Sequence, residues 1–264
     1  MPPEQPVRST SLRDAWAELV QGSACVGCAR PGRPLCIPCR EALPRTAAPA
    51  WPLPVPPGLR TPYAAGPYDG VLRAMVLAHK EDGVLALAGP LGSVLHTAVA
   101  AALKGIPADH PVLLVPVPSR RAAVRRRGYD ATHALARRAA AGLGADRPDV
   151  RVARLLRLRP GVADQAGLGA HGRSLNLHGS MAAPADRVRR LPLAAAHVIL
   201  LDDVLTTGAT AREGQRALEA AGIAVHAIAT VAATRRLHPP GAAGGAVPVP
   251  SVSVPATADG PPSR

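Results

Sequence analysis

The sequence has almost no aromatic residues. Phenylalanine is absent, and aromatic residues make up 2% of the 264 residues, although 47% are hydrophobic. A folded core must therefore be built from Leu, Val, Ile and Ala, which are the apolar types that remain. The same scarcity argues against a protein that binds single strands mainly by base stacking, because such proteins use aromatic side chains as platforms.

Long apolar runs and a leader pattern are also missing. No segment reaches the roughly 18 uninterrupted apolar residues that a membrane-spanning helix needs. The first 20 residues lack the basic-then-apolar layout of a secretory signal. We therefore expect a cytoplasmic protein without membrane insertion. The length suffices for one α/β domain and a small accessory module.

Lysine is scarce, although the chain is strongly basic. Lys80 and Lys104 are the only lysines, so arginine supplies nearly all of the positive charge behind the formal net charge of +13. The densest basic run is SRRAAVRRRGYD, at residues 119–130. This run is compatible with a solvated loop and helix start. It is also compatible with a site for a diphosphate or a nucleic-acid backbone, both of which suit the guanidinium fork.

All four cysteines fall in one short cluster. Cys25, Cys28, Cys36 and Cys39 follow the pattern C-x2-C-x7-C-x2-C, in which each pair can place two thiolates on one metal. The residues between the pairs cannot build a core, so a metal is the expected source of local folding energy. Two disulfides are the alternative, and they need an oxidising compartment. We predict a closed, structural Zn²⁺ site in a module at about residues 22–44.

The stretch HVILLDDVLTTGATAR, residues 197–212, carries the most informative motif. Its apolar run from Val198 to Leu201 predicts a strand buried on both faces, as in parallel sheets. The strand leads into Asp202 and Asp203. Two adjacent carboxylates at the end of a buried strand need a cation or hydroxyl partners, because unpaired charges are costly to bury. The sequence therefore predicts a ligand at this strand end.

A hydroxyl-rich loop follows the two acids. It consists of Thr206, Thr207, Gly208, Ala209 and Thr210, and a helix is expected from Ala209 to about residue 222. A loop that enters a helix N-terminus presents free backbone N–H groups that suit a phosphate. Carboxylates beside a phosphate-binding loop match a ligand with both hydroxyls and phosphate. A ribose phosphate is such a ligand.

Helices and strands alternate along the rest of the chain. We expect helices at 11–21, 69–83, 85–103 and 130–142, and strands at 111–118, 149–158, 197–202 and 223–233. Such alternation predicts an α/β fold with a mostly parallel sheet that binds its ligand at the carboxyl ends of the strands. The Gly-rich span 159–180 is too long for an ordinary connection, and we interpret it as a lid.

Composition divides the chain into five parts. The division is a tail with a short helix at 1–21, the zinc module at 22–44, a Pro-rich linker at 45–61, the main domain at 62–235 and a disordered tail at 236–264.

The stretch VILLDDVLTTGAT resembles the phosphoribosyl-diphosphate signature of type I phosphoribosyltransferases. Four further blocks accompany it in the order seen in the ComF family, named for competence protein F. They are CVGC…LCIPC, YDGVLRAMVLAHK, VPVPSRRAAVRRRGYD and DQAGLGAHGRSLN. The resemblance covers roughly residues 22–235. It implies a type I phosphoribosyltransferase-like sheet flanked by helices, with a flexible hood and an N-terminal zinc finger.

The resemblance also implies roles for individual residues. Asp202 and Asp203 would bind the ribose hydroxyls, directly or through Mg²⁺, and the loop 206–210 would wrap the 5-phosphate. The remaining matches are Ser119 and Arg120 in the diphosphate loop, Lys80 at the end of its block, and Gln165, Arg173 and Asn176 in the mobile segment. For Lys80, Gln165 and Asn176, a surface or capping role is the alternative.

The chain departs from the family pattern in three places. Tyr129 is followed by Asp130 and Ala131 where the family usually has Asn-Gln, and Glu81 replaces a common aromatic residue. Thr206 stands where some purine-using relatives place a carboxylate that acts as general base. The general base must therefore come from elsewhere in the chain, or the acceptor, an unknown base, must bring its own lone pair.

Three functions follow from these features. The first is a phosphoribosyltransferase that binds phosphoribosyl diphosphate and Mg²⁺, with Arg120 stabilising the departing diphosphate. The second is a non-catalytic accessory of DNA uptake in natural transformation, or of recombination, that binds single-stranded DNA or partner proteins. The third is a scaffold whose zinc module recruits a partner.

Overall fold

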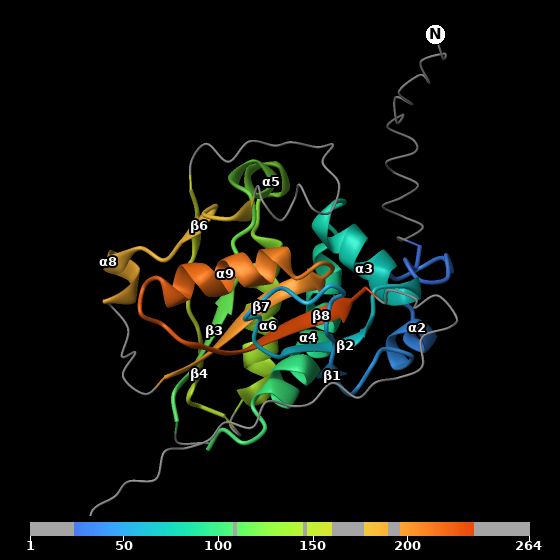
Figure 1. The fold of residues 1–264 in the computed structure, drawn as a ribbon. Helices are drawn as coiled ribbons and strands as arrows, with labels where there is room; N and C mark the ends of the chain where they lie inside the picture. Colours follow the sequence, from blue (N-terminus) through green and yellow to red (C-terminus); the bar gives the residue numbers. More distant parts are fainter. Residues whose placement is uncertain (1–23, 108–109, 145–146, 160–176, 190–195, 235–264) are drawn as a thin grey trace, which may run out of the picture.

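A six-stranded, mostly parallel sheet organises the protein. The computed structural model describes residues 24–107, 110–144, 147–159, 177–189 and 196–234. The strand order is β1-β2-β8-β7-β3-β4, and within this sheet only the edge pair β1–β2 is antiparallel (Figure 1). The strands are β1 (Ala48–Pro49), β2 (Pro62–Pro67), β3 (Val112–Pro116), β4 (Val150–Val152), β7 (His197–Leu205) and β8 (Val225–Ala233). The predicted mostly parallel α/β sheet is confirmed.

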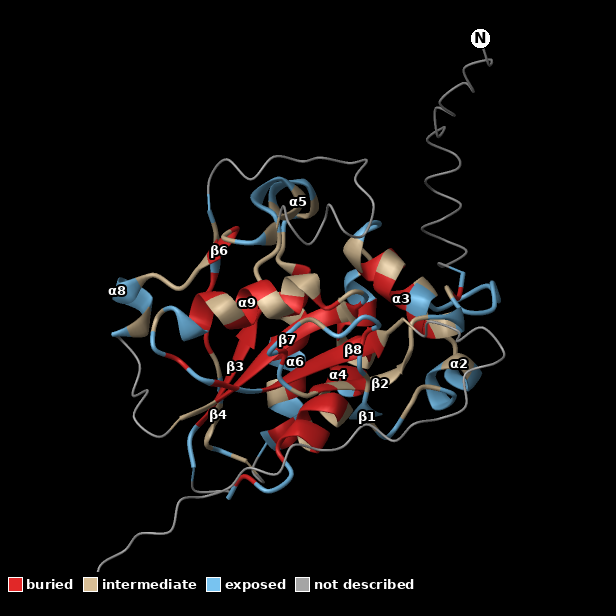
Figure 2. Cartoon of the chain, viewed as in Figure 1, coloured by how far each residue is buried: buried red, intermediate tan, exposed pale blue. Residues whose placement is uncertain are grey.

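Helices cover both faces of this sheet. On one face lie α3 (Gly70–Lys80), α4 (Ala88–Ala102), which follows the short 3-10 helix η1 (Leu85–Leu87), and α6 (Ala131–Leu143). The opposite face is covered by α9 (Ala209–Glu219), which lies in front of the sheet in Figure 1. Figure 2 shows the buried residues gathered on the sheet and on the helix sides that face it.

The strand β7 is buried on both faces, as the apolar run predicts. Ile199 and Leu201 pack into the core under α4, whereas Val198 and Leu200 pack into the core under α9. The strand continues through the two acids as far as Leu205, so the acids belong to the strand itself.

Two parts of the sequence fold differently from the expectation. The expected single strand at 149–158 is two strands, because Leu155 N–H donates to the Ala153 carbonyl and turns the chain after β4. The second piece, β5 (Arg157–Leu158), pairs with β6 (Met181–Ala182) in a separate antiparallel sheet. The Arg-rich run, taken as a loop, contains the short helix α5 (Arg121–Arg127).

The antiparallel pair β5–β6 is attached to α9 by a buried carboxylate. Glu213 is 3% exposed, and its Oε1 accepts a hydrogen bond of 2.8 Å from Met181 N–H. Arg216 Nε lies 2.6 Å from Glu213 Oε2, and Arg216 also donates to the Met181 carbonyl. The short helix α8 (Ala185–Val188) follows β6.

The helices α4 and α6 approach each other closely at Gly92. A Cβ atom at this position would lie 2.2 Å from Arg138 Cβ, whereas at Gly89, earlier on α4, nothing lies within 4 Å. The two helices can therefore pack at this distance only because residue 92 has no side chain.

The stretch Leu85–Ala102 is long and apolar enough, by length and composition alone, to cross a membrane. In the structure 56% of it is buried, and Leu91, Leu95 and Ala98 have no exposed surface. Its apolar composition is therefore explained by packing in the core. The expected helix at 11–21, most of the expected lid and the tail at 236–264 lie outside the described residues.

Candidate functional site

The four cysteines meet at one point. Their Sγ atoms all lie within 4.8 Å of one another, and no disulfide joins them. Sulfur atoms at about 2.3 Å from a tetrahedral Zn²⁺ lie roughly 3.8 Å apart, so this arrangement fits a four-thiolate metal site. The N–H of Cys36 donates to Cys25 Sγ at 3.4 Å and lowers the pKa of Cys25 to about 6. Cys25 is therefore predisposed to be a thiolate.

The cysteine module, which includes α2 (Ile37–Glu41), packs against the main domain through α3. A Cβ atom at Gly27 would lie 3.0 Å from Cys39 Sγ and 3.1 Å from a methyl group of Val71, near the start of α3. Val26 and Leu35 are half-buried against the core on the same side. The module is therefore docked on the domain that carries the acid pair.

The acid pair lies near the carboxyl end of β7 and is almost completely buried. Asp202 is 9% exposed and Asp203 is 5% exposed. Lys80, the last residue of α3, places its Nζ 2.6 Å from Asp203 Oδ2. The Oδ1 atoms accept backbone hydrogen bonds of 2.9 Å, Asp202 from Asp203 N–H and Asp203 from Val204 N–H. One lysine thus faces two carboxylates.

The electrostatics of this cluster leave it short of positive charge. Burial, followed by the charge of Asp203, raises the pKa of Asp202 well above its ordinary value. Burial opposes the charge on Lys80, but the attraction and hydrogen bond of Asp203 outweigh it, so the pKa of Lys80 is raised. A divalent cation beside the pair would supply the missing charge, and carboxylate oxygen is the ligand that Mg²⁺ prefers.

The turn after β3 lies beside the acids. Since β3 and β7 are parallel neighbours with Pro116 opposite Leu201, the chain that leaves β3 reaches Ser119 and Arg120 next to the end of β7. A cavity of about 730 Å³ opens there. Seven of the residues proposed from the sequence line it: Lys80, Ser119, Arg120, Asp202, Asp203, Thr206 and Thr210.

The remaining sequence-derived residues have other positions. Thr207, Gly208 and Ala209 belong to the same loop but do not line the cavity. Gln165, Arg173 and Asn176 lie outside the described residues.

The hydroxyl-rich loop is held from behind by the Pro-rich segment. Gly208 has φ 74° and is the N-cap residue of α9. A Cβ atom there would lie 3.0 Å from Pro52, 3.2 Å from Pro56 and 3.3 Å from Leu59. Two side chains of α9 bind the same segment: Arg212 Nε donates to the Pro57 carbonyl at 2.9 Å, and Gln215 Nε2 donates to the Gly58 carbonyl at 2.8 Å. The segment therefore fixes the loop from the side away from the cavity.

Two residues that the sequence did not indicate hold Lys80 in place. Arg127 Nη1 donates to the Lys80 carbonyl, and the Tyr129 hydroxyl donates to the His79 carbonyl. His79 is 1% exposed, and burial lowers its pKa. The two contacts join residues that are 47 and 50 positions apart in the sequence. A periodic pattern of apolar residues does not predict contacts over such distances. Only their presence in the block VPVPSRRAAVRRRGYD hinted at a role.

Asp130 organises the turn that carries Ser119. Its Oδ1 accepts from the Ser119 hydroxyl at 2.8 Å and from His133 N–H at 3.3 Å, so it caps α6. Its Oδ2 lies 3.3 Å from Arg154 Nη2. The residue that departs from the family pattern thus anchors the expected diphosphate loop.

A scan of protein-family models and a search of curated proteins found no match to this chain. The resemblance to the ComF family and to type I phosphoribosyltransferases therefore stays a prediction. The geometry defines an α/β protein with a four-cysteine cluster and an acid-and-hydroxyl-lined cavity at the carboxyl end of its central strand.

Proposed function

We propose that the protein binds phosphoribosyl diphosphate with Mg²⁺ at the end of β7 and transfers the phosphoribosyl group to a base. One observation carries this proposal. The buried acid pair, the hydroxyl-bearing loop and the turn with Ser119 and Arg120 surround a single cavity of about 730 Å³. Acids for ribose hydroxyls, a loop for the 5-phosphate and a cation for the diphosphate thus lie within reach of one ligand.

Each group has a defined task in this reaction. Asp202 and Asp203 bind the ribose hydroxyls and would hold Mg²⁺, which supplies positive charge to the diphosphate when bound. The first-turn N–H groups of α9, which lack intrahelical partners, bind the 5-phosphate. Lys80 orients Asp203 through the ion pair of 2.6 Å between its Nζ and Asp203 Oδ2. Arg120 stabilises the charge that develops on the diphosphate.

The transfer itself forms one bond and breaks one bond at the anomeric carbon. A nitrogen of the acceptor base forms the new C–N bond, and the C–O bond to the diphosphate breaks with its electron pair. Among the described residues, Glu81 is the third carboxylate that lines the cavity, and it lies 3.3 Å from Arg126. Position 206 carries a threonine, so the proton of the acceptor nitrogen passes to the departing diphosphate or to solvent.

Binding is the first test. Calorimetric titration of magnesium phosphoribosyl diphosphate into the wild type is expected to show saturable binding that Asp202→Asn/Asp203→Asn abolishes. Asp82→Asn/Asp186→Asn is the matched control, because it removes two exposed carboxylates that do not line the cavity. Absence of binding by folded wild type, or equal loss in both double variants, would refute the proposal.

Catalysis is the second test. Diphosphate release is measured across a panel of purine and pyrimidine bases, with Arg120→Ala compared with the wild type. We expect release with at least one base and a lower rate in the variant. Binding without release for every base would leave a sugar-phosphate sensor in place of a transferase.

We also propose that the cysteine module holds one structural Zn²⁺. With four Cys ligands the metal has no open position for a substrate. Metal analysis is expected to find one zinc per chain in the wild type and in Arg33→Ala, an exposed change within the module, and a loss in Cys39→Ala. A zinc-free wild type with an unchanged melting temperature would contradict this.

A further inference from the structure

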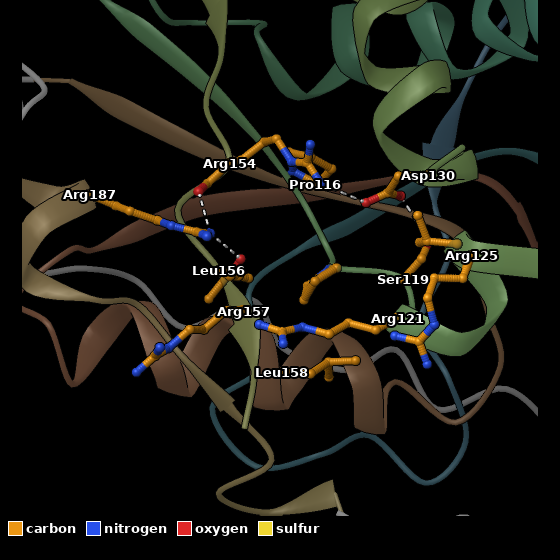
Figure 3. A pocket seen from close by; sticks show the side chains of 12 residues that line it. Pro116, Ser119, Arg121, Arg125, Asp130, Arg154, Leu156, Arg157, Leu158 and Arg187 are labelled. Atoms are coloured by element: carbon orange, nitrogen blue, oxygen red, sulfur yellow. Dashed lines mark hydrogen bonds and ion pairs between the residues drawn. The ribbon is translucent and has the colours of Figure 1, made fainter. Parts of the chain in front are cut away.

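A second cavity lies on the other side of α5 from the acid pair. Its volume is about 310 Å³, and five of its twelve lining residues are arginines. These are Arg121 and Arg125 from α5, Arg154 from the chain between β4 and β5, Arg157 from β5, and Arg187 from α8 (Figure 3). Asp130 is the one carboxylate among the lining residues.

The helix α5 separates the two cavities. Arg121, Val124 and Arg125 line the arginine-rich cavity, whereas Ala122, Ala123, Arg126 and Arg127 line the cavity of the acid pair. Residues four positions apart share a helix face, so Arg121 and Arg125 project together. The two cavities have only Pro118, Ser119 and Leu158 in common. The arginine-rich cavity is therefore separate from the cavity of the acid pair, and different arginines line it.

Two of the five arginines are held in fixed positions. Arg187 Nη1 donates at 3.0 Å to the carbonyls of Arg154 and Leu156, which orients its guanidinium along the wall, as Figure 3 shows. Arg154 lies 3.3 Å from Asp130. Asp130 also accepts a hydrogen bond from the Ser119 hydroxyl, so its carboxylate is shared between Arg154 and Ser119. Carbonyl oxygens carry no net charge, and the positive charge of Arg187 stays unneutralised.

The other three arginines have no partner in the part of the chain that the structure describes. Neither a hydrogen bond nor an ion pair involves the side chain of Arg121, Arg125 or Arg157 there. Like charges four residues apart on a helix repel each other. Five guanidinium groups around one carboxylate thus leave a strong excess of positive charge at a small cavity, and an anion is what would relieve it.

We propose that this cavity binds a small, multiply charged phosphate ligand, at a site distinct from that of phosphoribosyl diphosphate. Guanidinium groups match phosphate oxygens in geometry and charge. The volume lies at the small end of the range for ligand pockets, which fits an oligophosphate group. None of the twelve lining residues is aromatic, so the site lacks the stacking platform of a single-strand binder.

The two sites share one wall. Ser119 lines both cavities, and its hydroxyl is bonded to Asp130, which also faces Arg154. An anion that draws Arg154 away from Asp130 changes the partner set of the residue that holds Ser119. The ligand of the arginine-rich cavity is therefore placed to influence the diphosphate turn of the other site.

The test uses inorganic tripolyphosphate in magnesium-free buffer, titrated calorimetrically into the full chain. The variant Arg125→Ala/Arg157→Ala removes two exposed, unpartnered arginines of the cavity. Its control is Arg151→Ala/Arg189→Ala, which removes two exposed arginines that line neither cavity. Because hydrogen bonds to charged groups are strong, we expect Kd to rise at least about tenfold in the cavity variant. The control is expected to stay within about twofold of the wild type.

Several results would overturn the proposal. These are the absence of saturable tripolyphosphate binding, an unchanged Kd in the cavity variant, and an equal weakening in both double variants, which would mean non-specific attraction. A single-stranded oligothymidylate that loses affinity in the cavity variant while tripolyphosphate does not would assign the surface to nucleic acid. Arg157→Glu provides an independent check, since a reversed charge must weaken binding more than Arg157→Ala. The outcome does not depend on phosphoribosyl diphosphate, because neither Arg125 nor Arg157 lines the other cavity.

Discussion

The substitution Gly208→Ala tests how the Pro-rich segment supports the phosphate-binding loop. Gly208 has φ 74°, and a residue with a Cβ atom costs about 1–2 kcal/mol in this left-handed conformation. The new methyl group would lie 3.0–3.3 Å from Pro52, Pro56 and Leu59. Such overpacking costs about 1–3 kcal/mol, because proline rings cannot rotate away. The free energy of unfolding should therefore fall by about 2–5 kcal/mol.

Gly222→Ala provides the matched control. Gly222 follows α9 with φ 77°, and nothing lies within 4 Å of a Cβ atom built there. This variant should show only the backbone cost of about 1–2 kcal/mol. The difference between the two variants isolates the contact between the loop and the Pro-rich segment.

Urea denaturation followed by circular dichroism measures both free energies of unfolding. Titration of magnesium phosphoribosyl diphosphate adds a functional comparison, and only Gly208→Ala is expected to weaken binding. Equal destabilisation of the two variants would refute the reasoning, because the Pro-rich segment would then not press on the loop.

Three further predictions concern packing, an ion pair and protonation. Gly92→Ala should lower the free energy of unfolding by about 1–3 kcal/mol through overpacking, whereas Gly89→Ala should be neutral or stabilising by up to about 1 kcal/mol; equal values in urea denaturation would contradict the close approach of α4 and α6. Glu213→Gln should lower the free energy of unfolding by about 1–3 kcal/mol, whereas Glu219→Gln, at a half-exposed ion pair, should lower it by less than about 1 kcal/mol. Thermal unfolding of the two variants measures the difference. Magnesium phosphoribosyl diphosphate should displace a proton from Asp202, so its affinity should rise with pH toward the raised pKa of that carboxyl. Calorimetry in buffers of different ionisation enthalpy detects the released proton. Proton release that persists in Asp202→Asn would exclude Asp202 as its source.

Local sequence signals predicted the centre of the molecule. The uninterrupted apolar run before Asp202 marks a strand buried on both faces, and the periodic segment after Gly208 marks α9. The cysteine spacing predicted a cluster because C-x2-C brings thiolates together within one turn. Strand and helix patterns of this kind depend on near neighbours, so they can be read without knowledge of the fold.

Long-range contacts decided the parts that the sequence did not predict. The strand β2 (Pro62–Pro67) has two prolines and no apolar alternation, and it forms because β8 offers it a parallel partner. The bend after Ala153 sends Leu155 and Leu156 into the core under α9 and so divides the expected strand. The contact of Tyr129 with His79 spans 50 positions and has no local signature. Each of these features depends on segments that are far apart in the sequence.

The helix α3 connects the cysteine module to the acid pair along one axis. Val71, at its beginning, contacts the module, and Lys80, at its end, reaches Asp203. The helix has 11 residues and is thus about 16 Å long, and a helix resists compression along its axis. One short, stiff element thus carries both a contact with the cysteine module and the only lysine among the residues that line the cavity of the acid pair.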